Sequence, residues 1–169
     1  TSKGEGDLNY RVFEKFHDPG VLVHGVSLKP GKPLCLAVLE GTPAAILPGF
    51  PTSSTFTFSK FIAPVLRKLA GLAPERSVHV QAKIPLRLNS DKGRTEFNLV
   101  HLVRNEDGFS AYSTGKGSGS ITGFARADGF MEIPRNTEML EAGEETTIHL
   151  LGASTRPPDL MIIGSHCVG

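Results

Sequence analysis

The sequence predicts two parts: an α/β domain over residues 1–71, followed by a small all-β barrel domain over residues 72–154. Three observations indicate this. Residues 51–70 carry apolar side chains at the three- and four-residue spacing of an amphipathic helix. Ahead of it, two short apolar runs flank a turn, as in a β-hairpin. After Gly71, short alternating segments separated by turn residues replace the helical pattern, which is typical of a small barrel.

The elements of the first part follow from its apolar spacing. A short helix is predicted over residues 8–16, with Asp7 able to cap it, and a strand over residues 21–26. The hairpin is predicted from strands at residues 34–39 and 44–47, joined at Glu40-Gly41-Thr42. The long helix should end at Gly71, and Pro64 inside it predicts a kink or a break.

The second part consists of predicted short strands. They cover residues 78–88, 96–103, 109–113, 129–133 and 146–151. The boundary near residues 72–76 is too short for a flexible linker, so we expect the two parts to pack together. Residues 155–169 are predicted to form a linker and the first strand of a possible further domain, and we expect further chain on both sides.

Composition limits the classes of partner. The chain has 39% hydrophobic and 21% charged residues and a net charge of +1, which argues against nucleic acid as a partner. No stretch has the length of a membrane span and no signal-peptide pattern is present, so no membrane partner is expected. The spacing of Cys35 and Cys167 suggests neither a metal site nor a disulfide framework, so a cytoplasmic location is predicted.

Two Pro-Gly turns indicate a candidate site. Lys29-Pro30-Gly31-Lys32 precedes the predicted hairpin and Pro48-Gly49-Phe50-Pro51 follows it, so an antiparallel hairpin would bring the two turns together. Pro followed by Gly predicts a type II turn, which holds Lys29 and Lys32 close together. Two ammonium groups at that range repel each other unless an anion lies between them.

The second turn opens the long helix and adds hydrogen-bond donors. Pro51 suits the first helical position, and the N–H groups that follow it have no partner within the helix. The hydroxyls of Thr52, Ser53 and Ser54 lie in the same place. Solvated lysines and a simple helix cap would explain either turn alone, but the two turns together predict an anion site.

Other candidates are less specific. The loop containing Ser2, Gly4 and Gly6 could wrap a phosphate, and Asp7 could hold Mg²⁺ or simply cap the helix. The loop 114–120 could bind an anion or merely connect two strands. The six histidines show no metal-ligand spacing, and no arrangement typical of a hydrolase triad is present.

These motifs together resemble the MoeA/gephyrin E-domain family, the molybdopterin molybdotransferases, over roughly residues 1–151. The segment 1–7 is similar to the second half of the family's Ser-Gly-Gly-x-Ser-x-Gly-x-x-Asp motif, without its leading Ser-Gly-Gly. The family's Pro-Gly-Lys-Pro turn and its Leu-Pro-Gly-Asn-Pro-x-Ser helix start resemble residues 30–33 and 47–53. Its barrel motifs resemble Gly117–Gly119, Ala127–Gly129 and Leu140–Glu144.

The resemblance implies a partial MogA-like molybdopterin-binding domain and a Mg²⁺-dependent insertion of molybdate into adenylylated molybdopterin, with release of AMP. It implies that Lys29, Lys32 and Ser53 hold molybdate, and that Ser2 and Gly4 approach the pterin phosphate. Asp7 would serve the Mg²⁺ or the reactive water as the catalytic residue. The remaining implied substrate-binding residues are Gly31, Pro48, Gly49, Pro51 and, from the barrel, Arg94, Ser118 and Ser120.

Some features depart from the family pattern. Phe50 stands where many members have Asn, and Gly25 stands where some members have Lys. A homodimer is implied, and the chain alone is expected to be inactive. Two alternatives stay open: a pterin- or oxyanion-binding or sensing module without catalysis, suggested by residues after 158, and a scaffold role of the gephyrin kind.

Overall fold

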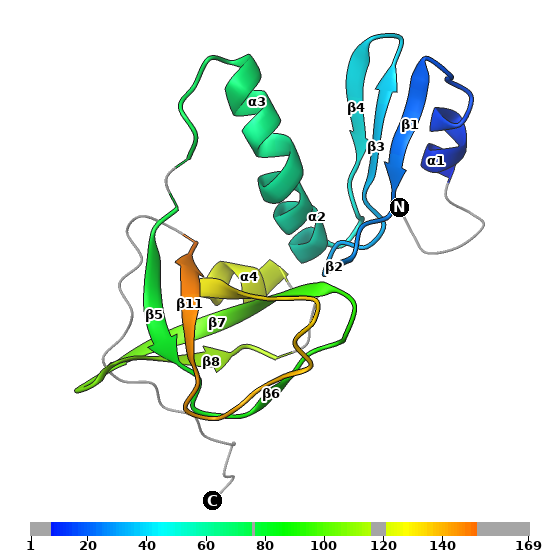
Figure 1. Ribbon diagram of the computed structural model, residues 1–169. Coiled ribbons are helices and arrows are strands. Elements are labelled where there is room, and N and C mark those ends of the chain that lie inside the picture. The colour runs from blue at the N-terminus through cyan, green and yellow to red at the C-terminus, as the bar shows by residue number, and fades with distance from the viewer. Residues whose placement is uncertain (1–7, 76, 116–120, 152–169) are drawn as a thin grey trace, which may run out of the picture.

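The structure is a computed structural model that describes residues 8–75, 77–115 and 121–151. Its first part contains helix α1 (Leu8–Phe13) and the antiparallel sheet β1-β3-β4, formed by β1 (Pro19–His24), β3 (Cys35–Leu39) and β4 (Thr42–Ile46). Figure 1 shows α1 on the outer side of this sheet, at the far end of the molecule from the second part. The predicted α/β character of the first part is confirmed.

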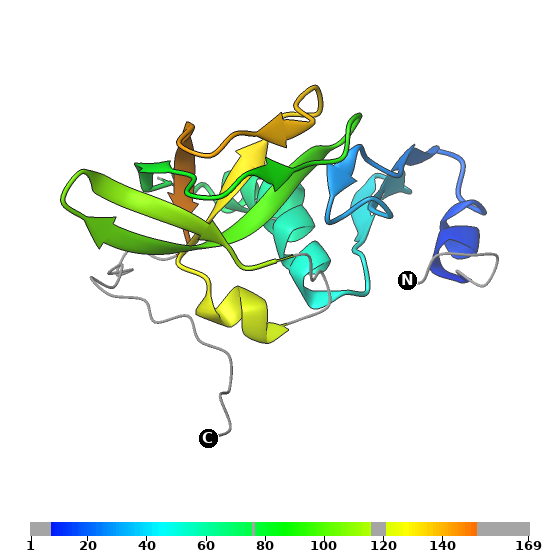
Figure 2. The ribbon, with the colours of Figure 1, turned by 90° about the horizontal axis from the view of Figure 1, so that it is seen from below.

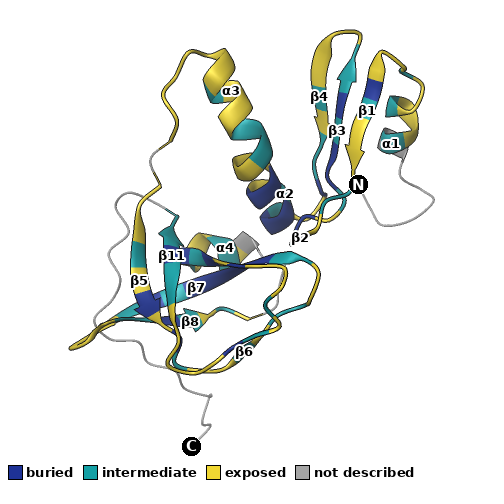
Figure 3. Cartoon of the chain, viewed as in Figure 1, coloured by how far each residue is buried: buried dark blue, intermediate teal, exposed yellow. Residues whose placement is uncertain are grey.

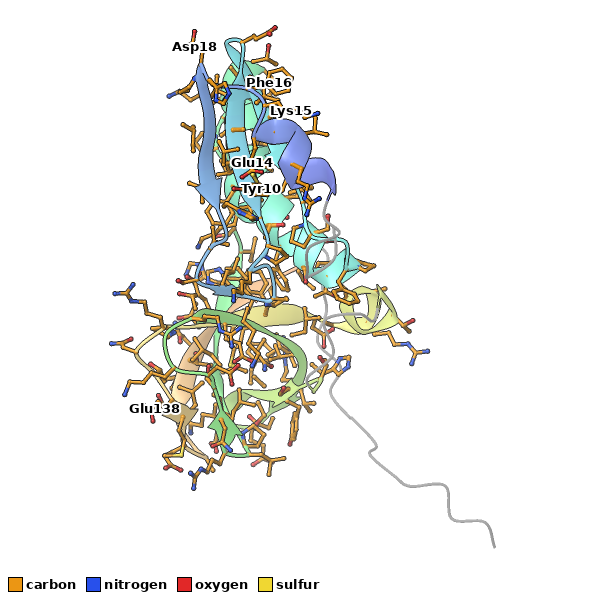
Figure 4. All side chains as sticks on the ribbon, turned by 90° about the vertical axis from the view of Figure 1, so that its right-hand side faces the viewer. Tyr10, Glu14, Lys15, Phe16, Asp18 and Glu138 are labelled. Carbon is orange, nitrogen blue, oxygen red and sulfur yellow. The ribbon has the colours of Figure 1, made fainter. Side chains whose placement is uncertain are left out.

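The boundaries of the first elements differ slightly from those predicted. Helix α1 ends at Phe13, and the following residues wind more tightly, since the N–H of Phe16 donates to the carbonyl of Phe13 over 3.1 Å. Strand β1 lies two residues earlier than predicted because Gly25, with φ of 87°, takes the chain out of extended geometry. In Figure 4, Tyr10 lies close to the sheet, where its ring stacks on His24 with the centroids 3.7 Å apart.

The predicted hairpin is confirmed. Strands β3 and β4 pair from Cys35 opposite Ile46 to Leu39 opposite Thr42, so only Glu40 and Gly41 form the turn. Both have positive φ, 50° and 79°, as a type I′ turn requires. This two-residue turn fixes the register and therefore places the residues before β3 beside those after β4.

The first Pro-Gly turn has a different geometry from the type II turn that the sequence predicts. Gly31 has φ of 129°, well away from the value near 80° of a type II turn. The N–H of Leu34 donates to the carbonyl of Gly31 over 3.2 Å, which closes a turn over residues 31–34, two residues later than the predicted one. The type II prediction is therefore wrong. A Pro-Gly pair reports only local preference, whereas Gly31 also packs against the long helix, where an added Cβ atom would lie 2.6 Å from Cγ2 of Thr57.

The long helix runs from Pro51 to Leu69 in three pieces, α2 (Pro51–Thr57), a π-helical turn η1 (Phe58–Ile62) and α3 (Ala63–Leu69). Figure 1 shows them as one continuous rod. Pro64 therefore produces a widened turn in place of a break. The N–H of Ala63 donates to the carbonyl of Phe58, five residues back. This wider winding relieves the clash between a proline ring and the carbonyl four residues before it.

The second part is a closed five-stranded barrel, as predicted. Its strands are β5 (His79–Lys83), β7 (Thr95–Asn105), β8 (Gly108–Ser113), β9 (Gly129–Ile133) and β11 (Glu145–Leu150). The order is β7-β8-β5-β11-β9, and pairing of β9 with β7 closes the barrel. Figure 2 views these strands from below.

Four short elements were not predicted. The expected strand 78–88 is divided into β5 and β6 (Leu88–Asn89), with Pro85 between them, and β6 pairs with β10 (Met139–Leu140). Helix α4 (Ile121–Arg126) has six residues and contains Gly123, which weakens its pattern. Strand β2 (Leu28–Lys29) belongs to the first part of the chain, yet it pairs in parallel with β7 of the barrel.

Two hydrophobic clusters hold the structure together. The first fills the barrel with Ala82, Ile84, Val100, Leu102, Ala111, Met131, Ile133, Leu140 and Ile148. The second joins the two parts and contains Leu28 of β2, Phe56 of α2, and Phe97 and Leu99 of β7. The ring of Phe56 lies 4.9 Å from that of Phe97 and 5.1 Å from that of Phe130, centroid to centroid. The two parts therefore pack together as expected.

Burial changes sharply along the long helix. Figure 3 shows α2 largely buried and α3 largely exposed. Val65, Leu66 and Leu69, which the apolar pattern places on one face of the helix, are all exposed. Exposed apolar side chains on Leu22 and Val23 of β1 accompany them. The α/β part thus leaves apolar surface uncovered.

Among the described residues, no helix combines the length and the apolar character that a membrane crossing requires.

Phe56→Ala should lower the free energy of unfolding by about 3–5 kcal/mol, because Phe56 is 4% exposed and packs on rings from the barrel. Phe58→Ala is the matched control, since Phe58 lies two residues further along the same rod and is 39% exposed. Urea unfolding of both variants measures the difference. Equal losses for the two variants would contradict this account of the interface.

Gly31→Ala should cost about 1–3 kcal/mol of stability, because the methyl group meets Thr57 and the φ of Gly31 disfavours any side chain. Thr57→Ser removes the facing methyl group but keeps the hydroxyl that donates to the carbonyl of Ser53 over 2.8 Å. The double variant should therefore lose less than the sum of the single losses. If the stability losses of the two single variants, measured by thermal unfolding, simply add in the double variant, the contact between residues 31 and 57 does not contribute to the loss.

Candidate oxyanion-binding site

The two Pro-Gly turns are neighbours, as predicted from the hairpin. Cys35 and Ile46 pair at the open end of β3 and β4, and the turns continue from that end. Gly31 of the first turn is buried against Thr57 in the helix that the second turn opens. The geometry therefore brings residues 29–32 and 48–53 into one region of the molecule, at the side facing the barrel (Figure 1).

The second turn forms the start of α2. Phe50 takes the position before the first helical residue, with φ of −78° and ψ of 131°, and its carbonyl accepts the N–H of Ser54 over 2.8 Å. The ring of Phe50 is exposed and makes no capping hydrogen bond. Pro48 and Ser53 are buried, Pro51 is half-buried and Gly49 is exposed. Ser53 therefore lies inside the packed base of the helix.

Lys29 lies between two carboxylates of the barrel. Its Nζ is 2.9 Å from Oδ2 of Asp91 and 3.2 Å from Oε2 of Glu96. The Glu96 side chain is only 5% exposed, and the same Oε2 accepts the hydroxyl of Ser90 over 2.9 Å. Burial of a carboxylate is tolerated when it is paired and hydrogen-bonded in this way.

The pairing shifts the pKa of Lys29. Burial lowers the pKa of its ammonium group, whereas hydrogen bonds with Asp91 and Glu96 raise that pKa by more, so the net shift is upward. Lys29 is therefore charged at neutral pH. The contribution of its raised pKa to stability is complete below the ordinary lysine pKa and is lost as the pH rises through the higher folded-state pKa.

Arg94 joins the same group from the barrel. Its Nη2 is 3.2 Å from Oδ2 of Asp91, the oxygen that also contacts Lys29. The two cations therefore come from different parts of the chain and meet at one oxygen atom. Arg94 and Lys29, both predicted substrate-binding residues, are brought together by the structure.

Lys32 differs from Lys29 in its environment. It is exposed, and it forms no ion pair with any carboxylate among the residues that the structure describes. Its backbone is nevertheless fixed, because its carbonyl accepts the N–H of Val26 over 2.9 Å. Lys32 thus offers a positive charge at the turn, while the charge of Lys29 is already compensated.

Five predicted site residues lie outside the described residues: Ser2, Gly4, Asp7, Ser118 and Ser120. Asp7 is the predicted metal ligand. Within the described ranges, no group of three or more His, Cys, Asp or Glu side chains could hold a metal ion.

Sequence reasoning missed Asp91, Glu96 and Ser90. The sequence pattern places Ser90 and Asp91 between the predicted strands 78–88 and 96–103, and Glu96 at the start of the second strand. These residues come close to Lys29 because β2 pairs with β7, with Lys29 opposite Glu96. A strand of two residues carries no periodicity, so nothing in the sequence marks that pairing.

Comparison with known proteins follows the same division of the chain. Residues 1–68 match the family model described as "Probable molybdopterin binding domain", and residues 81–151 match that of the MoeA C-terminal region, domain IV. A molybdopterin molybdenumtransferase of Haemophilus influenzae is 32% identical over 159 residues, which are 90% of this chain and 39% of that protein. One from a Nostoc species is 30% identical over 85% of this chain and 34% of its own length.

Solved structures give the same result. A molybdopterin biosynthesis MoeA protein from Pyrococcus horikoshii superposes with a TM-score of 0.70 and 35% identity, over 87% of this chain and 35% of that chain. This chain therefore spans about a third of the length of the relatives it matches. Because the two family models together cover most of the chain and the solved structure shares its fold, the chain belongs to the MoeA family, of which it carries part of the molybdopterin-binding domain and the C-terminal region.

Proposed function

We propose that the protein containing this chain is a molybdopterin molybdotransferase of molybdenum-cofactor biosynthesis. It would insert molybdate into adenylylated molybdopterin, with release of AMP and dependence on Mg²⁺. Membership in the MoeA family carries this proposal, because relatives named molybdopterin molybdenumtransferase match 85–90% of the chain. Since the chain spans about a third of those relatives, the reaction is proposed for the whole protein, with the chain alone inactive.

The chain's part in this reaction is to bind the oxyanion. Molybdate is a dianion, and ammonium and guanidinium groups bind such an anion through charge-assisted hydrogen bonds, which are stronger than neutral ones. Lys32 is exposed and forms no ion pair among the described residues, and Lys29 and Arg94 meet at a single carboxylate oxygen. The molybdate ligands proposed here are Lys29, Lys32 and Ser53, with Arg94 closing from the barrel and Gly31, Pro48, Gly49 and Pro51 shaping the turns.

Charge neutralisation and positioning are what these residues contribute to the transfer. A molybdate dianion and the phosphates of a pterin nucleotide repel each other, and fixed cations between them reduce that cost. The register of the hairpin and the close approach of Gly31 to Thr57 place the two turns side by side. We propose that Ser2 and Gly4 approach the pterin phosphate and that Ser118 and Ser120 help to close the site.

We propose Asp7 as the catalytic residue and the Mg²⁺ ligand, as the family resemblance implies. Asp7 lies outside the described residues, within which no group of three or more His, Cys, Asp or Glu side chains could hold a metal ion. We also propose a cytoplasmic homodimer, which is consistent with the exposed apolar side chains on β1 and α3.

Lys32→Ala should weaken molybdate binding about tenfold, because it removes a charge-assisted hydrogen bond to the ligand. It should leave stability nearly unchanged, since Lys32 is exposed. Lys92→Ala is the control. Lys92 is also exposed and pairs with Glu138, so the variant removes one positive charge without changing either turn. Calorimetric titration with molybdate compares the variants. Similar affinities for both would place the oxyanion elsewhere.

The reaction itself is tested by AMP release from adenylylated molybdopterin, with Mg²⁺ and molybdate, by the intact protein. Lys29→Ala/Lys32→Ala should abolish the molybdate-dependent release. Because Lys29→Ala also leaves the buried Glu96 without its cation, a triple variant that adds Glu96→Gln separates loss of binding from loss of folding. Unchanged release would refute the site, while tight binding without any release by the wild type would favour the non-catalytic binding module.

A further inference from the structure

Asp91 occupies a distinctive place in the candidate site. It lies in the loop between β6 and β7, and its Oδ2 contacts Nζ of Lys29 at 2.9 Å and Nη2 of Arg94 at 3.2 Å. One anionic oxygen thus bridges two cations that the proposed function assigns to an oxyanion ligand. This is the arrangement that an oxygen atom of a bound oxyanion would adopt between the same two groups.

The two carboxylates around Lys29 differ in how firmly they are held. Glu96 is in β7, which is paired with β2 and β9, and its side chain is 5% exposed and bonded to Ser90. The Asp91 side chain is 44% exposed and lies in a loop. An exposed ion pair is weak because water screens it, so Asp91 can leave Lys29 at far lower cost than Glu96 can.

We propose that Asp91 is an internal substitute for the oxyanion, a positioning residue that holds Lys29 and Arg94 together until the ligand displaces it. The proposal rests on the proposed function, because it takes the oxyanion to bind between these cations. In the unliganded protein Asp91 keeps the two cations in place and compensates their charge. A tetrahedral oxyanion with two charges then competes with one carboxylate for the same donors, while Glu96 continues to anchor Lys29.

This competition has two consequences of opposite sign. Removing the carboxylate should make the unliganded protein slightly less stable, because Lys29 and Arg94 lose a partner. The same change should make oxyanion binding tighter, because the ligand no longer has to displace Asp91. A merely structural role for Asp91 would lower stability without tightening the binding of an anion.

Asp91→Asn is the direct test, with molybdate alone as the probe and the intact protein as the sample. We expect molybdate to bind roughly fivefold more tightly than to the wild type, which is the order of magnitude of one exposed ion pair. The molybdate-induced rise in Tm should be larger in Asp91→Asn than in the wild type, while the Tm without molybdate is lower. Asp91→Glu, which restores a carboxylate, should return the affinity toward that of the wild type.

Glu138→Gln is the matched control. Glu138 pairs with Lys92, the residue after Asp91, and Figure 4 shows it at the outer edge of the barrel. The variant removes the same charge nearby, so it reports any general electrostatic gain for an anion. We expect its molybdate affinity to stay within about twofold of the wild type, because Glu138 pairs with Lys92 rather than with the two site cations and salt screens the longer-range effect.

The outcomes separate the two proposals. Equal tightening in Asp91→Asn and Glu138→Gln, or none in Asp91→Asn, would overturn the role of Asp91. If Lys32→Ala still weakens molybdate binding in that case, the proposed oxyanion site stands without a role for Asp91. Molybdate binding that neither Lys32→Ala nor Asp91→Asn changes would overturn the proposed site as well.

Discussion

The pairing of β2 with β7 is the constraint on which the candidate site depends. Two residues of the first part, Leu28 and Lys29, enter the sheet of the barrel and stand opposite Thr95 and Glu96. Leu28 contributes apolar surface to the cluster around Phe56, and Lys29 contributes the cation that makes burial of Glu96 possible. Without this short strand, the lysine turn would have no fixed position relative to Arg94.

The electrostatic balance of the site follows from that constraint. Among the described residues, Lys29 and Arg94 supply two positive charges, and Asp91 and Glu96 supply two negative ones. Compensation of this kind lets the unliganded protein hold cations close together without strong repulsion. A site with uncompensated cations would bind oxyanions more tightly, but it would attract every small anion and would lower the stability of the fold.

Much of the architecture could be predicted from the sequence, because long patterns carry it. The hairpin at Glu40-Gly41, the helix from Pro51 and the barrel strand 129–133 all follow from periodicity and turn residues. The type II prediction at Gly31 was wrong because a Pro-Gly pair reports only local preference, and it carries no information on the packing of Gly31 against Thr57. The partners of Lys29 were missed because a two-residue strand has no period, and contacts between residues 67 positions apart leave no local trace.

The path of the chain through β2 also bears on how the molecule is connected. The chain reaches the barrel at Leu28, returns to the first sheet at β3, and passes to the barrel again through residues 70–78. The covalent linker is therefore not what holds the two parts together. Cutting the gene within the linker would yield two polypeptides that still share a strand ladder, an aromatic cluster and a partly buried ion pair, so the two could assemble as a split protein.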